Sequence, residues 1–293
     1  MKILIELPSW LGDAVMTTPA IENIVKHFSG VDITLIGSFI SIEALKNHPN
    51  ITKTYVLEKN YLHLFKSIKN FGKFDIFISF RGSFRSKLIK FCISSKRKYQ
   101  FNKNNFLEGH QVEKYNNFVN FVTKTKQYPG KLKLHAKNKL QVSNKKLLGI
   151  NPGASYGNAK RWYPEKFASV ASELASSYDI IILGSAKEKE IALDIERQLL
   201  EKGVSNYQNL SGKTNIEELI SQIASLDLII TGDSGPMHLA AAYQIPTVSI
   251  FGPTNDIETS QWTNKKNIIV KKNLDCQPCM KRTCPLKPVS YTH

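Results

Sequence analysis

The sequence of 293 residues has few cysteines, few acidic side chains and no long hydrophobic run. Four cysteines do not make a disulfide framework in a chain of this size. Because no run of about 18 apolar residues occurs, we expect no transmembrane helix. The apolar stretch from Met1 to Val15 is too short for a signal peptide, and Glu6 and Asp13 interrupt it. We therefore expect a cytoplasmic protein.

Acidic residues are scarce in one half of the chain. Lys and Arg number 40 against 24 Asp and Glu, which gives a net charge of +16. Residues 1–150 hold 25 basic and 9 acidic side chains, whereas residues 151–293 hold 15 of each. This asymmetry indicates two halves with different partners. A basic half suits nucleic acid, an anionic membrane or a phosphorylated substrate, unless its lysines only reflect a Lys/Asn-rich proteome.

Strand and helix patterns alternate in both halves, which predicts two α/β units with parallel sheets. In the first half the expected strands are 2–7, 31–37, 51–57 and 74–80. A first helix is expected after the turn that ends at Gly12 and runs to about Phe28, and further helices are expected over 39–46, 61–71 and 111–124. In the second half the strands are 147–151, 179–184, 226–231 and 246–251, and the helices are 164–177, 187–201, 215–224 and 236–243. The pattern weakens over 95–146, and 137–146 is the expected linker. Ligands in such folds bind at the carboxyl ends of the strands.

The segment Pro8-Ser-Trp-Leu-Gly-Asp-Ala-Val-Met-Thr-Thr-Pro19 follows the first strand. Asp13 lies where the next helix should begin, and Asp is a preferred N-cap residue. The same place, at the carboxyl end of a strand, also suits a general base that faces a cleft. The residues alone leave both interpretations open. The turn lacks a GxGxxG pattern, so it is not a dinucleotide-binding fingerprint.

Two further loops are candidates for phosphate binding. Asn151-Pro-Gly-Ala-Ser-Tyr-Gly-Asn-Ala-Lys-Arg-Trp-Tyr-Pro164 is rich in small polar residues. Its N–H groups, with Ser155 and Lys160, favour a diphosphate site over an ordinary loop with a basic rim.

Leu228-Ile-Ile-Thr-Gly-Asp-Ser-Gly-Pro-Met-His-Leu-Ala-Ala-Ala242 places a Gly-Asp-Ser-Gly turn between a strand and a helix. The turn either presents N–H groups and Ser234 to a ligand, or Asp233 and Ser234 cap the helix. His238 is either part of that site or a packed core histidine. Because no Gly-x-Ser-x-Gly elbow is formed, we reject a hydrolase nucleophile.

Three of the cysteines lie in Cys276-Gln-Pro-Cys-Met-Lys-Arg-Thr-Cys284-Pro. Structural zinc needs four ligands, and this segment has no secure fourth, so reduced thiols or a local disulfide are favoured over a metal. Cys92 lies in an apolar helix and is expected in the core.

Taken together and in this order, the four segments resemble the lipopolysaccharide heptosyltransferases of glycosyltransferase family 9, over nearly the whole chain. The cysteine segment is similar to the branch that adds the second heptose, heptosyltransferase II. The resemblance implies an α/β GT-B fold with two Rossmann-like domains and a cleft between them. Residues 1–146 would bind the acceptor and residues 147–293 the nucleotide sugar.

The implied reaction is inverting transfer of L-glycero-D-manno-heptose from ADP-heptose to the first heptose of the inner core on lipid A. Asp13 matches the catalytic base of the family, and Lys160 matches the lysine at the donor diphosphate, where it would stabilise the leaving charge. The residues matched to donor binding are Ser155, Lys160, Glu188 for the ribose, Thr214 for the adenine pocket, Asp233, Ser234, Gly235 and His238.

The implied partners are ADP-heptose, a heptosyl-Kdo2-lipid A acceptor and the anionic inner face of the inner membrane. Kdo carboxylates and lipid phosphates would attract the basic first half, so nucleic acid is not expected as a partner. No Asp-x-Asp motif sits at a strand end, so we expect no obligate metal or other cofactor.

The alternatives are a nucleotide-sugar epimerase of the same fold, a basic nucleic-acid-binding protein and an inactive homologue. The last is suggested by the chain end, Lys287-Pro-Val-Ser-Tyr-Thr-His293, which does not spell the helix with which GT-B proteins usually end. The C-terminal helix is thus expected to be missing or divergent.

Overall fold

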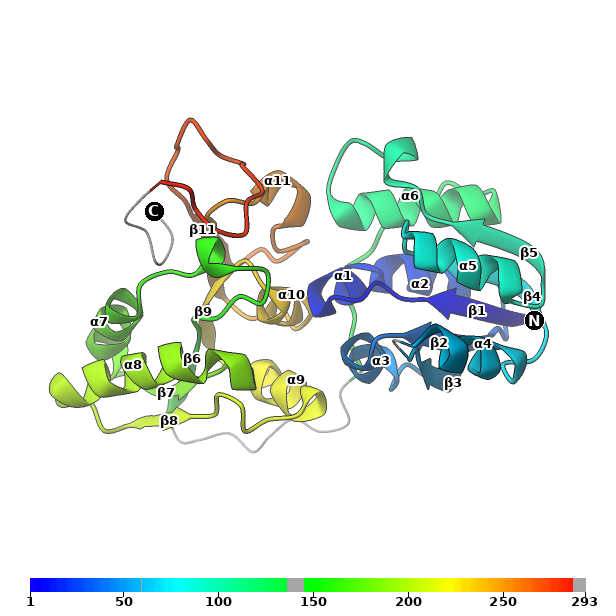
Figure 1. Ribbon diagram of the computed structural model, residues 1–293. Helices are drawn as coiled ribbons and strands as arrows, with labels where there is room; N and C mark the ends of the chain where they lie inside the picture. The colour runs from blue at the N-terminus through cyan, green and yellow to red at the C-terminus, as the bar shows by residue number, and fades with distance from the viewer. Residues whose placement is uncertain (59, 136–144, 287–293) are drawn as a thin grey trace. The chain divides into compact units, whose positions relative to one another are not determined.

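The computed structural model describes residues 1–58, 60–135 and 145–286 (Figure 1). The chain divides into two compact units, Met1–His135 and Ala136–His293. Most of the expected linker 137–146, and the chain end 287–293, lie outside the described residues. The expected boundary between 146 and 147 lies close to the segment 136–144.

The first unit alternates strands and helices. Its strands are β1 (Lys2–Glu6), β2 (Asp32–Gly37), β3 (Ile51–Val56), β4 (Phe74–Ser79) and β5 (Ser95–Gln100). Its helices are α1 (Leu11–Met16), α2 (Thr18–His27), α3 (Phe39–Leu45), α4 (Tyr61–Lys69), α5 (Phe84–Cys92), the 3-10 turn η1 (Lys103–Asn105) and α6 (Gln111–Thr123).

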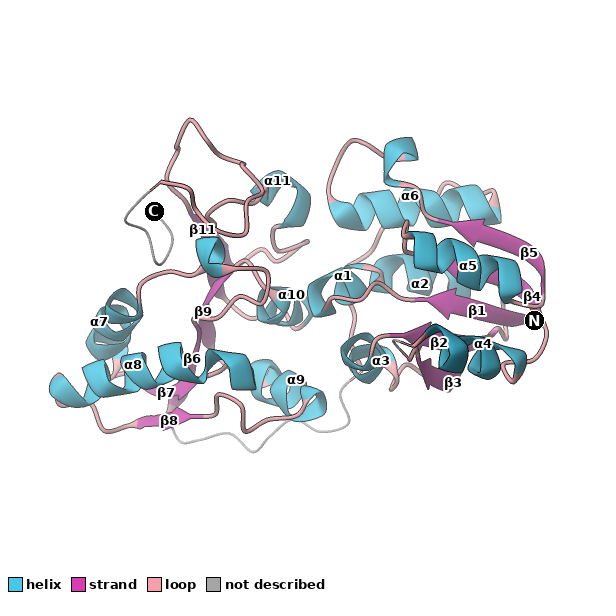
Figure 2. Cartoon of the chain, viewed as in Figure 1, coloured by secondary structure: helices cyan, strands magenta, loops and turns pink. Residues whose placement is uncertain are grey.

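All strands of the first sheet are parallel, in the order β3-β2-β1-β4-β5. Helices α4 and α5 pack over one face of the sheet, where Leu64, Ile68 and Ile89 meet Leu4 and Phe77 in one apolar core. Helix α3 packs on α1, and α6 packs on α2 and α1, which forms the other helical layer (Figure 2). The carboxyl ends of the strands therefore share one edge of the sheet.

The structure corrects three sequence expectations in this unit. The first helix is broken at Thr17, because Pro19 has no N–H for the bond to Val15 and its ring would clash with that carbonyl. Strand β5 was not predicted, because its sequence SKRKYQ is polar and basic, as edge strands often are. Cys92 is exposed rather than in the core, at the last residue of α5.

The second unit repeats the architecture. Its strands are β6 (Lys146–Asn151), β7 (Tyr178–Ile182), β8 (Tyr207–Asn209), β9 (Leu228–Gly232), β10 (Thr247–Ile250) and β11 (Asn267–Val270). Its helices are α7 (Pro164–Leu174), α8 (Lys189–Glu201), α9 (Ile216–Ala224), α10 (Gly235–Ala242), α11 (Asp256–Thr259) and the 3-10 turns η2 (Asn158–Lys160) and η3 (Ala186–Glu188).

The second sheet is also parallel, in the order β11-β10-β9-β6-β7-β8. Helices α7 and α8 cover one face, where Phe167, Ile195 and Leu199 pack on Ile150 and Ile182. Strands β8 and β11 and helix α11 were not predicted, because they have only three or four residues each. Two parallel α/β sheets confirm the predicted fold class.

No helix among the described residues is long and apolar enough to cross a bilayer.

Candidate active site

Two loops of the second unit meet where β6 and β9 end. The strands pair in parallel with Asn151 opposite Thr231, so the loops after them start side by side. The amide of Asn151 donates to the hydroxyls of Thr231 and Ser234, each at 3.0 Å. The two loops approach closely at Gly232, where an added Cβ would lie 3.1 Å from the carbonyl oxygen of Lys160, a tight contact. The predicted phosphate loop and the Gly-Asp-Ser-Gly turn are therefore parts of one site.

A buried ion pair lies at the centre of this site. Lys160 Nζ donates to Asp233 Oδ2 at 2.5 Å and to the Asp233 carbonyl at 3.3 Å. The hydroxyl of Thr254 donates to the same carboxylate oxygen at 2.6 Å. Asp233 is 5% exposed and Lys160 12% exposed as side chains, so water screens the pair weakly. Thr254 was missed in the sequence, although its place just after a strand was a usable signal.

The capping interpretation of Asp233 and Ser234 is wrong. Ser234 is the N-cap residue of α10 by position, but its side chain makes no capping hydrogen bond. Its hydroxyl instead accepts from Asn151, while Asp233 binds Lys160 and Thr254. These side chains therefore do not cap the helix. In its first turn Pro236 has no N–H and the Met237 N–H donates to the Ser234 carbonyl at 3.1 Å, so an anion here would meet the Gly235 N–H and the positive end of the helix dipole.

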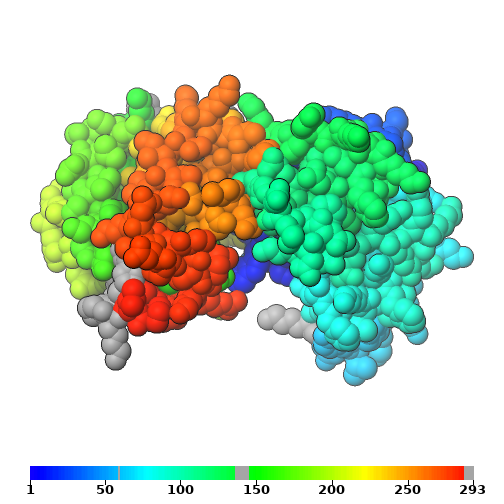
Figure 3. Space-filling model, turned by 90° about the horizontal axis from the view of Figure 1, so that it is seen from above, coloured from blue at the N-terminus to red at the C-terminus, as the bar shows by residue number. Residues whose placement is uncertain are grey.

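The cysteine segment packs against the loop that carries Lys160. Tyr156 places its ring 4.8 Å from Lys160 Nζ, and its hydroxyl donates to the Met280 carbonyl at 2.6 Å. The Ala159 N–H donates to the Arg282 carbonyl at 3.1 Å. Figure 3 shows this red segment beside the orange residues that follow β10, where the Met280 N–H donates to Pro253 at 2.8 Å. All four cysteines are free thiols, so no disulfide forms in the segment.

The other expected donor residues have mixed surroundings. Glu188 is buried against Gly153, where an added Cβ would collide with its carboxylate, and it accepts from the Ser185 N–H at 2.6 Å. His238 is buried in the first turn of α10. Ser155 is exposed in its loop, and Thr214 is half-buried, next to Asn215, the N-cap residue of α9. The structure gathers Lys160, Asp233 and Ser234 directly and leaves the ligand contacts of these four as expectations.

Asp13 lies in the first unit, in the first turn of α1. The helix begins at Leu11 with Trp10 as its N-cap, so the N-cap interpretation of Asp13 is wrong. Its side chain is half-buried, and its negative charge acts on the phenol of Tyr115 on α6. Burial, followed by the negative charge of Asp13, raises the pKa of the Tyr115 phenol well above its usual value. That phenol therefore stays protonated beside the carboxylate.

Glu6 is a second carboxylate at the carboxyl edge of the first sheet, and its place in the sequence does not point to a functional role. Its side chain is fully buried and accepts from Ser79 Oγ at 2.6 Å and Ser86 Oγ at 2.8 Å. Arg81 lies 3.8 Å away. Burial raises the pKa of Glu6, and the hydroxyls and then the arginine offset only part of that rise. No motif marks this residue, because its partners lie 73 and 80 positions away.

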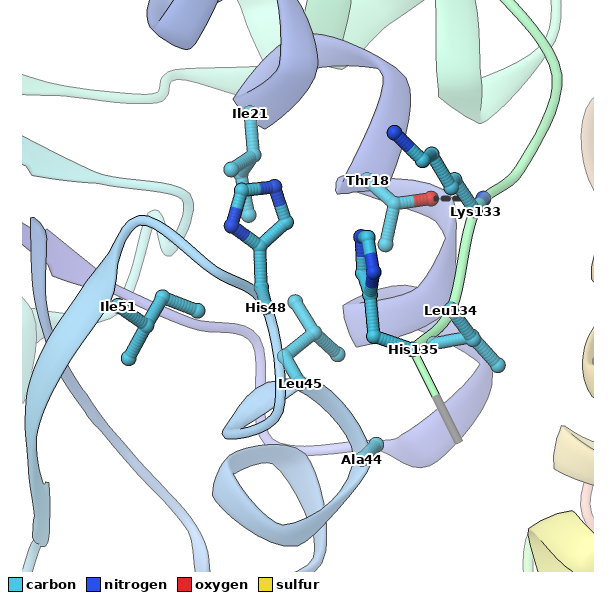
Figure 4. A pocket seen from close by; sticks show the side chains of 9 residues that line it. All are labelled: Thr18, Ile21, Ala44, Leu45, His48, Ile51, Lys133, Leu134 and His135. Atoms are coloured by element: carbon cyan, nitrogen blue, oxygen red, sulfur yellow. Dashed lines mark hydrogen bonds between the residues drawn. The ribbon is translucent and has the colours of Figure 1, made fainter. Parts of the chain in front are cut away.

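One cluster of described residues has the composition of a metal site, namely Glu22, His48 and His135. Figure 4 shows the two histidines and the neighbouring Lys133. The Asn50 N–H donates to His48 Nδ1 at 3.1 Å, so His48 Nε2 carries the ring proton and donates to Glu22 at 3.1 Å. Lys133 Nζ lies 3.2 Å from the same carboxylate and supplies the positive charge. These contacts satisfy Glu22 as an ion-pair network that joins α2, the turn before β3 and the segment after α6.

The pKa values of this cluster agree with that description. Burial would raise the pKa of Glu22, but hydrogen bonds and charge from Lys133 and His48 outweigh it and lower the pKa. Burial lowers the pKa of both His48 and His135, so the imidazoles are neutral while Glu22 is ionised.

The arrangement of Lys160 and the N-terminus of α10 suits the binding of a phosphorylated ligand by the second unit. Lysine has three N–H donors, and Lys160 uses two of them on Asp233, which leaves one for a phosphate oxygen. The helix N-terminus beside it adds a partial positive charge. A negative charge that develops on a diphosphate would be stabilised here.

The chain belongs to glycosyltransferase family 9, the heptosyltransferases, whose sequence model matches residues 118–290. It is 43% identical to lipooligosaccharide heptosyltransferase 2 of Campylobacter jejuni serotype O:2, over 98% of this chain and 92% of that relative. The corresponding protein of serotype O:6 is also 43% identical, over 98% of this chain and 93% of its own length. The chain is therefore a glycosyltransferase of the heptosyltransferase family.

Solved structures give the same fold. The structure of Escherichia coli ADP-heptose lps heptosyltransferase II matches with a TM-score of 0.76 and 25% identity, over 92% of this chain and 90% of that one. A glycosyl transferase family 9 protein of Veillonella parvula matches with a TM-score of 0.80 at 22% identity, over 92% and 86%. These similarities confirm the predicted GT-B fold.

Proposed function

We propose that this protein is an inverting heptosyltransferase that moves L-glycero-D-manno-heptose from ADP-heptose to the first heptose of the lipopolysaccharide inner core. The acceptor is then heptosyl-Kdo2-lipid A. The observation that carries the proposal is the 43% identity, over nearly the whole chain, to lipooligosaccharide heptosyltransferase 2. The buried cluster of Lys160, Asp233 and Thr254 supports a diphosphate-bearing donor.

In this proposal the second unit, residues 147–293, binds ADP-heptose. Lys160 and the N-terminus of α10, with Ser234 and Gly235, hold the diphosphate, while Ser155 and His238 line the same site. Glu188 binds the ribose and Thr214 lines the adenine pocket. As the bond from the anomeric carbon to the diphosphate breaks, Lys160 stabilises the charge on the departing ADP. The reaction needs no metal or other cofactor in this scheme.

The first unit, residues 1–146, binds the acceptor and supplies the base. Asp13 accepts the proton of the acceptor hydroxyl as that oxygen attacks the anomeric carbon from the face opposite ADP. Attack from that face inverts the anomeric configuration. Burial and then the negative charge of Asp13 hold the pKa of the nearby Tyr115 phenol well above its usual value, so that phenol stays protonated near the proposed base.

The acceptor also accounts for the charge of the chain. Kdo carboxylates and lipid A phosphates lie in an anionic leaflet, and residues 1–150 carry a net charge of +16. The protein acts on the cytoplasmic side of the inner membrane, as a peripheral protein held by this attraction.

The direct test is to incubate the protein with ADP-heptose and a heptose-terminated lipid A core and to weigh the product by mass spectrometry. The expected result is an acceptor heavier by one heptose, with release of ADP. A parallel incubation without acceptor tests the epimerase alternative, which would convert the donor alone. An unchanged acceptor beside an intact donor would contradict the proposal and favour an inactive homologue.

A further inference from the structure

Two neighbouring helices of the first unit present an outward surface that is both apolar and basic. On α4 the outward residues are Leu62, Lys66 and Lys69, and on α5 they are Phe84, Lys87 and Phe91. We call these six residues the α4/α5 surface. Leu62 and Phe84 are each 72% exposed and Phe91 is 84% exposed, although residues of this size are usually buried.

The spacing of these residues follows the helical repeat. Phe84, Lys87 and Phe91 stand three and seven positions apart, and Leu62, Lys66 and Lys69 stand four and seven apart, so each set forms one stripe. The opposite stripes, with Leu64 and Ile68 on α4 and Ile89 on α5, pack into the core. Each helix therefore already buries one apolar stripe in the core, and the exposed apolar residues are additional to it.

The two stripes lie side by side. Helices α4 and α5 pack together on one face of the first sheet (Figure 1). Arg85 of α5 stacks over the Tyr61 ring of α4 at 5.6 Å and donates to the Glu58 carbonyl, which joins the N-terminal ends of both helices. Figure 3 shows the cyan atoms of this part of the chain at the molecular surface.

The charge around the surface is mainly positive, and the nearest acids are Glu58 just before α4 and Asp75, which pairs with Lys96 at 2.7 Å. Neither α4 nor α5 contains Asp or Glu, and none occurs between Asp75 and Glu108. Residues 81–103 carry eight Lys and Arg side chains. Among them, Lys96 and Arg97 are exposed on the edge strand β5.

We propose that the α4/α5 surface docks on an anionic phospholipid bilayer, with Leu62, Phe84 and Phe91 inserted among the acyl chains and the lysines against the headgroups. Exposed apolar side chains and lysines on two helices that contain no acid match a bilayer, whose interior is apolar and whose anionic headgroups are negative. A protein partner would need acids to meet these lysines, and nucleic acid would leave the three apolar groups in water. The biological purpose of this docking rests on the proposed function, in which the acceptor is a lipid. The vesicle-binding test does not depend on that function.

The test is binding to vesicles that contain neither donor nor acceptor. The wild-type protein is expected to bind vesicles of phosphatidylglycerol and phosphatidylcholine much more tightly than vesicles of phosphatidylcholine alone. Leu62→Ser/Phe84→Ser should weaken binding at least about tenfold, from the apolar area no longer buried. Lys66→Glu/Lys87→Glu should weaken it several-fold for each charge reversed, with a steep dependence on salt.

The matched control is Leu193→Ser/Leu200→Ser on α8. These leucines are 56% and 59% exposed, but they lie among the acids Glu190, Asp194, Glu196 and Glu201. The control should bind vesicles like the wild type. The proposal would be overturned if Leu62→Ser/Phe84→Ser and Leu193→Ser/Leu200→Ser lost vesicle binding equally. It would also be overturned if wild-type binding did not depend on the anionic lipid.

A second readout separates this proposal from the proposed function. Transfer to a deacylated, water-soluble acceptor needs no bilayer, so Leu62→Ser/Phe84→Ser should retain wild-type turnover there. If the wild-type protein transferred heptose but did not bind vesicles, the docking surface would be contradicted and the proposed function would stand. If it bound vesicles but transferred no heptose, the proposed function would be contradicted and the docking surface would stand.

Discussion

Both units bury a carboxylate at the carboxyl end of a central strand, but they surround it differently. In the first unit Glu6 is held by two serine hydroxyls, with an arginine 3.8 Å away, and its pKa is raised by burial. In the second unit Asp233 is bound directly by Lys160 at 2.5 Å and by Thr254. The first arrangement raises the pKa of its carboxyl, whereas the second holds a compact charge pair beside a helix N-terminus.

The difference matches the division of labour that we propose. A site that binds a diphosphate needs a cation held in a fixed position. Asp233 holds Lys160 in this way, and Lys160 can contact Asp233 and the diphosphate together. The first unit carries the surplus charge of the chain on exposed lysines, which suits attraction of a large anionic acceptor rather than a single fixed contact.

The largest effect is expected for Asp13→Asn. Removal of a general base should lower kcat by about 10²- to 10⁴-fold, while the Kd for ADP-heptose stays unchanged because the donor binds the other unit. Steady-state kinetics and calorimetry measure the two quantities. Asp32→Asn, at the amino edge of the same unit's sheet, is the control and should leave both near wild type. Normal turnover by Asp13→Asn would remove that residue from the base role.

Lys160→Met should destabilise the second unit by about 3–5 kcal/mol, because it leaves the buried Asp233 charge without its partner. Urea unfolding, followed with hydrogen exchange of residues 146–286, measures this loss. Lys160→Met/Asp233→Asn removes both charges and should recover much of the stability. If the single and double variants were equally stable, the pair would not be the charge-compensating contact described above. Both variants should bind ADP-heptose weakly.

A pH titration of Glu6→Gln tests the carboxylate of the first unit. Because the folded pKa of Glu6 is raised above 4.5, its protonation stabilises the fold at low pH. That contribution is complete below pH 4.5 and is lost as the pH rises through the folded pKa. The unfolding free energy of wild type relative to Glu6→Gln should therefore fall with rising pH, by about 1.4 kcal/mol per unit of pKa difference.

Glu108→Gln, an exposed position in the same unit, provides the control for that titration and should show no such slope. A flat difference between wild type and Glu6→Gln would mean that Glu6 keeps an ordinary pKa when folded.

The smallest effect is expected from salt. Raising the ionic strength from low to physiological values should raise KM for the acceptor by about two- to fivefold, because exposed lysines are screened. KM for ADP-heptose should change less, since the Lys160 contact is largely buried. An equal response of both constants would argue against separate binding by the two units.

The sequence was informative where side chains repeat with a clear period. Strands β1 and β9 each contain three consecutive apolar residues, Ile3 to Ile5 and Leu228 to Ile230, and both strands were predicted within one or two residues. Strand β5 escaped because an edge strand can be as basic as SKRKYQ. The break at Thr17 was missed, although Pro19 signals it, because apolar residues continue on both sides.

Site residues were predictable as motifs but not as contacts. Asp233 and Ser234 stood out, yet their partners Asn151 and Thr254 come from other strand ends, and only the sheet order brings them together. Cys92 was misplaced because a single helical turn separates the buried Ile89 from the exposed stripe of α5. The role of Glu6 could not be found, since its serine partners lie on β4 and α5.

The most direct test of the central claim is hydrogen exchange of the full chain with ADP-heptose alone. We predict slower exchange in the loop 151–160 and in the turn 232–238, with no change around Asp13. Adding a deacylated acceptor should then slow exchange in the first unit. Protection by ADP-heptose confined to the first unit would contradict the assignment of the donor to the second.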